Sequence, residues 1–121
     1  MSGIIDRLKA EIAPGTRISK PETHETYRVK GWGIRRGERA LIYLVPNRND
    51  ASKPYPKGVT VSEWELACEQ LVTTGELRSS WFTSAFPEAS RRSPCNFTTI
   101  GGVFEILGLA VRDGRGAYRK E

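Results

Sequence analysis

Apolar side chains recur every three or four residues near the start of the chain, which is the spacing of an amphipathic helix. Four of them would share one helical face: Ile4, Ile5, Leu8 and Ile12. Ser2 can cap this helix because its hydroxyl accepts a hydrogen bond from a free backbone amide, and Pro14 with Gly15 ends it. A short helix with one apolar face needs a surface to pack on, so we expect a sheet beside it.

Residues 16–47 change to the pattern of β-structure. The expected strands are 17–19, 25–32 and 39–45. Tyr27 and Val29 alternate with polar residues, as in a half-buried strand, whereas residues 40–45 are apolar on both faces and predict the central strand. Residues 33–38 begin with one glycine and include another, which predicts a hairpin loop between two antiparallel neighbours. Three antiparallel strands are therefore expected in this half of the chain.

Helical spacing returns after residue 60. Thr60 and Glu63 match a capping box at the start of a helix. The apolar stripe of that helix is Trp64, Ala67, Cys68, Leu71 and Val72. Residues 73–75 interrupt the pattern, and a second helix is expected from Leu77 to the residue before Pro87.

A third helix is expected to begin at Thr98 or Thr99, after a loop over residues 88–96, and to end at Gly108. Its apolar stripe is Ile100, Val103, Phe104 and Leu107. Two adjacent glycines inside it weaken a helix, which predicts that another backbone approaches closely there. After this helix, the order strand, glycine-rich turn, strand predicts a hairpin over residues 109–119.

The predicted fold class is therefore α+β, with a short N-terminal helix, a three-stranded antiparallel sheet, three helices and a C-terminal β-hairpin. The length of 121 residues suits one domain over residues 1–121. Within it, a polar loop at 48–59 joins a β-sheet half at 1–47 to a helical half at 60–121. No stretch is apolar for the roughly 18–20 residues that a membrane span requires, so we expect a cytoplasmic protein without membrane contact.

Residue types that carry catalysis or bind metals are scarce in this sequence. His24 is the single histidine, and with Glu22 and Glu25 it forms only a weak metal or acid–base pattern, because zinc sites and catalytic triads need three converging groups. Cys68 and Cys95 lack CxxC spacing, and we expect both to be reduced and inert. The glycines near residue 33 do not match a nucleotide-binding motif. The sequence therefore predicts a protein that is not an enzyme and has no metal or cofactor.

The positive charge is concentrated in the first half of the chain. The net charge is +5. Residues 1–60 hold twelve Lys or Arg against six Asp or Glu, whereas residues 61–121 hold seven against eight. A basic surface attracts polyanions, so nucleic acid is the first partner class and an acidic protein surface the second.

The most informative stretch is residues 28–39, where cations surround one tryptophan at the expected hairpin. The candidate nucleic-acid contacts in it are Lys30, Trp32, Arg35, Arg36 and Arg39. Arginine can bind a phosphate through two hydrogen bonds, and an indole flanked by glycines can stack on an unpaired base. The competing interpretation places Trp32 in the core, with the arginines solvated.

Residues 60–120 resemble a winged-helix domain, in which a third helix ends in a junction such as Leu107-Gly108-Leu109 and a short hairpin with an arginine-bearing turn forms the wing. The resemblance implies that the helix from Thr98 to Leu107 is the recognition helix. It also implies that Arg112 and Arg115 lie on the wing, near phosphates or a minor groove. Together with Arg119 they would form a second basic group if the two basic hairpins lie on one face. The helix lacks Arg, Lys, Asn or Gln on its polar side, so base-specific recognition by it is not expected.

These features predict a non-enzymatic nucleic-acid-binding protein, acting on DNA or RNA through the two basic hairpins. The first alternative is a small protein-interaction, accessory or inhibitor module whose anchors would include Tyr55, Trp81 or Phe86. The second is a small basic nuclease or toxin, for which the sequence barely supplies a general base. The oligomeric state is left open, a dimer included.

Overall fold

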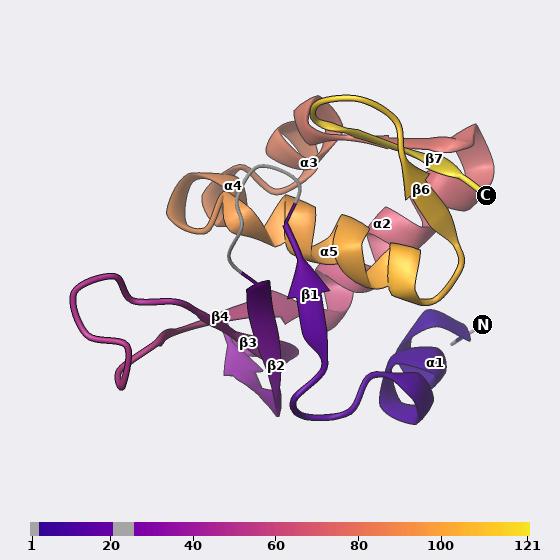
Figure 1. Ribbon diagram of the computed structural model, residues 1–121. Coiled ribbons are helices and arrows are strands. Elements are labelled where there is room, and N and C mark those ends of the chain that lie inside the picture. Colours follow the sequence, from indigo (N-terminus) through magenta and orange to yellow (C-terminus); the bar gives the residue numbers. More distant parts are fainter. Residues whose placement is uncertain (1–2, 21–25) are drawn as a thin grey trace. The chain divides into compact units, whose positions relative to one another are not determined.

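The computed structural model describes residues 3–20 and 26–121 and has the predicted α+β class. The chain divides into two compact units, Met1–Val61 and Ser62–Glu121. Figure 1 shows the helices and strands of each unit in their order along the chain. None of the described helices is long and apolar enough to cross a membrane.

The first unit consists of one helix and a four-stranded antiparallel sheet. Its helix is α1 (Gly3–Glu11), and its strands are β1 (Arg17–Ser19), β2 (Thr26–Arg35), β3 (Glu38–Val45) and β4 (Tyr55–Thr60). The strand order is β1-β2-β3-β4, so β3 is an inner strand, as its two apolar faces predict. Residues 40–43 of β3 are all buried, as are Ile4, Ile5 and Leu8 on the predicted face of α1.

The fourth strand corrects the predicted sheet, because residues 55–59 were expected to be loop and Thr60 to begin a helix. Pro56 and Gly58 gave the segment a turn-like composition, yet Pro56 pairs with Leu44 and Gly58 with Ile42. β4 is the last strand in the sheet order. Proline is tolerated in such a strand because an edge strand leaves one row of backbone amides unpaired. The loop from β3 to β4 is therefore shorter than predicted, and Figure 1 shows it projecting from the sheet.

The second unit consists of helices and a three-stranded sheet. The elements are α2 (Val61–Thr74), β5 (Glu76–Arg78), α3 (Ser79–Ala85), α4 (Pro87–Arg92), α5 (Cys95–Ile106), β6 (Ala110–Arg112) and β7 (Ala117–Lys120). The sheet order is β5-β7-β6, with both pairings antiparallel. The hairpin after the last helix was predicted, and β5 adds a third strand beside it.

Three boundaries in this unit differ from the sequence prediction. Leu77 lies in β5 rather than at the start of a helix, because Gly75 at φ +84° lets the chain leave α2 in a left-handed conformation. Pro87 begins α4 where a loop was expected, since proline fits the first turn of a helix, where its missing amide has no intrahelical partner. α5 starts just after its N-cap residue Pro94, three residues before the predicted start.

The core of the second unit is aromatic. Phe104 lies 5.9 Å from Trp64, and Phe97 lies 5.5 Å from Tyr118, measured between ring centroids. A Cβ at Gly101 would overlap the ring of Tyr118. Gly101 therefore leaves space for the side chain of Tyr118 in β7. The sequence had predicted the close approach of another backbone there instead.

A buried polar pair also joins α2 to α5. Asn96 donates from its Nδ2 to Oε1 of Glu63 over 3.0 Å, and both side chains are buried. The sequence had placed Glu63 in a capping box at the start of this helix. Its burial against Asn96 gives this carboxylate a role in packing the second unit.

Candidate nucleic-acid interface

The β2–β3 hairpin ends in a two-residue turn, where the sequence had predicted a six-residue loop. Arg35 pairs with Glu38, so only Arg36 and Gly37 lie in the turn. Their φ angles are +51° and +77°. Positive φ at both central positions is the mark of a type I′ turn, whose twist matches that of the flanking strands. The hairpin is therefore longer and more regular than predicted, and an arginine stands at its tip.

A β-bulge in β2 decides which side chains share a face. Val29 pairs with Tyr43 and Trp32 with Leu41, so the register shifts at Lys30 and Gly31. Tyr43 and Leu41 are two positions apart in β3 and point to the same side. The extra residue therefore moves Trp32 to the face that carries Val29, where regular alternation would have placed it on the opposite face. Lys30 lies in the bulge and is exposed.

One face of the hairpin brings together an aromatic ring, a cation and an exposed aliphatic side chain. Trp32 is half-buried, and the guanidinium carbon of Arg39 lies 5.2 Å from its ring centroid. Ile34 pairs with Arg39 across the strands and has 61% of its surface exposed. Trp32 is thus neither a core residue nor an open stacking face, because Arg39 lies against its ring.

The remaining predicted contacts of the hairpin lie elsewhere on it. Arg35 is on the opposite face from Trp32, and its Cγ lies 2.6 Å from the position that a Cβ on Gly58 would take. Arg35 donates from Nη1 to the carbonyl oxygen of Ile34 over 2.8 Å. Arg36 donates from Nη2 to the carbonyl oxygen of Gly58 over 3.4 Å. The glycine in β4 therefore makes room for Arg35 and accepts a hydrogen bond from Arg36, and the cations are distributed around the hairpin tip.

Arg36→Asn is expected to raise the free energy of unfolding by about 0.5–1 kcal/mol, because asparagine adopts positive φ more readily than arginine. Thermal or denaturant unfolding of the variant and the parent measures the difference. Arg36→Lys serves as the control, since lysine has the same difficulty with positive φ, and it should be no more stable than the parent. A decrease in stability in Arg36→Asn would show that the bond to Gly58 outweighs the strain at the turn.

The second predicted basic group lies on the β6–β7 hairpin. Arg112, Arg115 and Arg119 are all exposed. Arg119 pairs with both Glu76 in β5 and Val111 in β6. The backbone amide of Arg112 donates to Oε2 of Glu105 over 3.1 Å. Carboxylates therefore lie close to this group, which makes it a weaker attractor of anions than the β2–β3 hairpin.

An ion pair beside this group shows how its charge is balanced. Arg78 Nη2 lies 2.9 Å from Oε2 of Glu76, which is the cross-strand partner of Arg119. The hydrogen bond from Arg78, with its positive charge, holds the pKa of Glu76 below its usual value. Glu76 therefore stays ionised over the neutral range and offsets part of the positive charge of this sheet.

The helix that the winged-helix resemblance assigns to base recognition offers few exposed side chains. Eight residues of α5 are buried, including Thr99 and both glycines. Glu105 and Ile106 are exposed, and neither donates a hydrogen bond from its side chain to a base. α5 therefore exposes no Arg, Lys, Asn or Gln side chain, and its role toward a base sequence stays a prediction.

The described residues offer no alternative metal centre. Within residues 3–20 and 26–121, no group of three or more His, Cys, Asp or Glu could hold a metal ion. His24, Glu22 and Glu25 lie outside the described residues. Cys68 and Cys95 are half-buried and form no disulfide.

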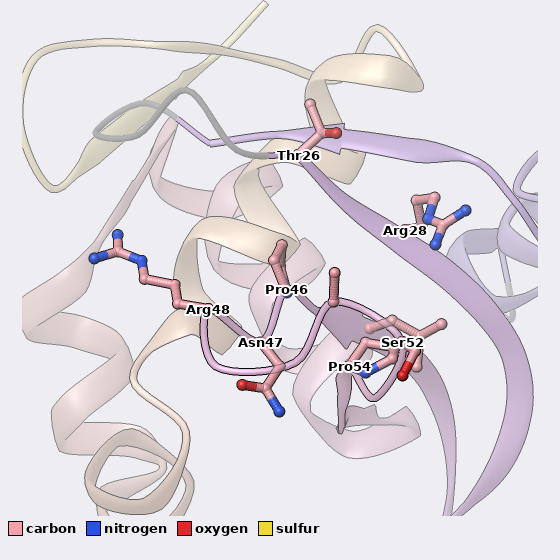
Figure 2. Close-up of a pocket in the computed structure, with 9 residues that line it drawn as sticks. Thr26, Arg28, Pro46, Asn47, Arg48, Ser52 and Pro54 are labelled. Carbon is pink, nitrogen blue, oxygen red and sulfur yellow. The ribbon is translucent and has the colours of Figure 1, made fainter.

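A cleft that the sequence did not predict lies at the far end of the hairpin, beside the β3–β4 loop (Figure 2). Its volume is about 610 Å³, and Arg28 and Arg48 lie on its rim. The side chain of Arg48 points away from Ser52 and Pro54 (Figure 2). Ser52 donates its hydroxyl to Asp50 over 2.6 Å, and this bond lowers the pKa of the Asp50 carboxyl. The two cations do not converge, and a carboxylate lies close by, so the hairpin tip remains the stronger candidate site.

No protein-family model, no curated protein and no solved structure matches the chain. The fold and the hairpin site therefore carry the functional interpretation by themselves.

Proposed function

We propose that the chain is a non-enzymatic nucleic-acid-binding protein whose main contact surface is the tip of the β2–β3 hairpin. Its cations would bind backbone phosphates, and Trp32 would stack on a base. These residues are Lys30, Trp32, Arg35, Arg36 and Arg39. The second basic group, on β6 and β7 and the turn between them, would add phosphate contacts. Its members are Arg112, Arg115 and Arg119.

The observation that carries the proposal is the arginine in the turn. Arg36 is the one non-glycine residue with positive φ in the described part of the chain. An arginine at this position lowers the free energy of unfolding relative to asparagine or glycine, which adopt positive φ more readily. Strain of this kind is kept most often where the side chain has a function, and a guanidinium at an exposed tip is well placed to bind a phosphate. Over residues 30–39 the hairpin carries three further cations and one carboxylate, that of Glu38.

Binding of this kind should depend little on base sequence. Phosphate contacts position a protein on nucleic acid without reading bases, and α5 exposes no Arg, Lys, Asn or Gln, the residues that most often bind base edges in pairs of hydrogen bonds. We therefore expect similar affinity for oligonucleotides of random sequence and a steep fall in affinity with salt, because each neutralised phosphate releases bound counterions. Binding measured at two salt concentrations tests this. An affinity that does not change with salt concentration would contradict the proposal.

Trp32→Ala is expected to weaken binding to single strands by roughly 1–3 kcal/mol while the salt dependence stays the same, because an indole releases no counterions. For this Arg39 must move aside, and the cation–π contact it gives up is weak at an exposed site, on the order of 0.5–1 kcal/mol. Trp32→Phe keeps an aromatic face and is the matched control. A drop of several kcal/mol in the free energy of unfolding, with binding lost only through unfolding, would contradict the stacking role and show that Trp32 mainly stabilises the sheet.

The protein-interaction alternative has one observation in its favour. Tyr55 is 51% exposed in β4, as an interface anchor would be. Trp81 and Phe86, the other anchors that the sequence suggested, pack edge to face on each other with ring centroids 6.2 Å apart. The nucleic-acid proposal is preferred because the positive charges and the strained backbone of Arg36 lie together at the tip of the β2–β3 hairpin. We propose that the protein acts in the cytoplasm and that its partner is DNA or RNA.

A further inference from the structure

We propose that Ile34 is a wedge that inserts between two stacked base pairs of duplex DNA from the minor groove, so that binding kinks the duplex. This inference rests on the proposed function and deepens it, since it names a deformable duplex as the ligand. Apolar side chains that open a base step in this way are a recurring device of minor-groove proteins.

The exposure of Ile34 is the first support. With 61% of its surface exposed, it is the most exposed large hydrophobic side chain in the described part of the chain. Its neighbours in β2 do not cover it: Gly33 has no side chain, and Arg35 is on the other face of the strand. An aliphatic group held out on a rigid strand near a turn can enter a gap without reorganising its own unit.

Charge complementarity selects nucleic acid as the occupant. Ile34 faces Arg39 across the hairpin and is followed directly by Arg35 and Arg36. A protein partner that covered Ile34 would have to accommodate these cations beside an apolar contact. The minor groove offers both a stack of apolar base faces and two rows of phosphates.

The spacing of the hairpin also fits a base stack. Trp32 and Ile34 share a face and are two strand positions apart, which is roughly 6.6 Å along the strand. This is close to twice the rise of about 3.4 Å between successive base pairs. An inserted Ile34 would therefore leave Trp32 about two base steps away, whereas Arg39, the cross-strand partner of Ile34, would stay beside the opened step and close to its phosphates.

The test uses the full chain and a duplex of about 25 base pairs with a donor dye at one end and an acceptor at the other. The parent should raise energy transfer, as a kink brings the ends together. Ile34→Ala should bind about tenfold more weakly, keep the salt dependence of the parent, and leave energy transfer at the level of the free duplex. Ile34→Leu restores an apolar wedge and should restore the kink.

Val72→Ala is the matched control, because Val72 is an aliphatic residue that is 57% exposed in α2. It should bind and bend the duplex like the parent. An Ile34→Ala variant that bends the duplex as the parent does overturns the wedge and leaves the proposed function standing. If the parent binds duplex in a salt-dependent way but does not bend it, the wedge is likewise overturned and the proposed function still stands. A parent that binds neither single-stranded nor duplex nucleic acid overturns both proposals.

Discussion

Phe104→Ala is expected to lower the free energy of unfolding by about 3–5 kcal/mol. The Phe104 side chain is fully buried at 0% exposure, and its ring lies 5.9 Å from the ring of Trp64, which is equally buried. Removing the ring forfeits its transfer free energy and leaves a cavity. The surrounding side chains and the backbone of α5 fill that cavity only partly, because folded proteins relax only in part around a void.

Denaturant unfolding monitored by tryptophan fluorescence measures this decrease. Ile106→Ala is the matched control, because Ile106 lies on the same helix with 48% of its surface exposed. It should change stability by about 0.5 kcal/mol or less, as surface substitutions usually do. Equal decreases in the two variants would mean that the buried face of α5 is not the one formed by Phe104.

The regular elements of the fold could be predicted from apolar periodicity. The stripe of Ile4, Ile5 and Leu8 and the run at 40–43 became buried faces, as expected. The elements that were missed depend on tertiary context. β4 contains Pro56 and Gly58 and forms because β3 offers an edge on which to pair. α4 begins at Pro87 and has only Ala89 buried, so its sequence carries almost no helical stripe.

The candidate site was predictable in its composition but not in its arrangement. The cluster of cations around Trp32 is visible in the sequence. The bulge at Lys30, which determines the face of Trp32, has no clear sequence signal beyond Gly31, whose φ is +141°. The exposure of Ile34 on a strand face was also missed, because residues 33–38 were predicted to be a loop, whereas Ile34 lies in β2 and pairs with Arg39. Register, rather than residue type, decided both outcomes.

The joint change Arg35→Ala and Arg36→Ala should have the largest effect on binding. For every phosphate that the variant no longer neutralises, the slope of log affinity against log salt should fall by about 0.7–0.9, whatever the sequence of the oligonucleotide. Neither arginine is buried, so the free energy of unfolding should change by roughly 1 kcal/mol or less. A melting curve on the same preparation checks this and separates a defect in phosphate binding from a defect in folding.

Arg91→Ala with Arg92→Ala is the matched control, because it removes the same charge from adjacent arginines. These two arginines lie in α4, and both pair with Glu88. If general positive charge alone attracts the nucleic acid, the two double variants should bind equally weakly. If the hairpin tip is the contact surface, the α4 variant should keep a slope close to that of the parent.

The slope of log affinity against log salt, measured for the parent and the two double variants on one random-sequence oligonucleotide, tests the central claim most directly. Binding through the β2–β3 hairpin predicts a slope that is shallower by about 1.4–1.8 in the Arg35 and Arg36 variant and nearly unchanged in the Arg91 and Arg92 variant. A folded Arg35 and Arg36 variant that binds with the parent's affinity and slope would contradict the claim and favour a protein partner instead.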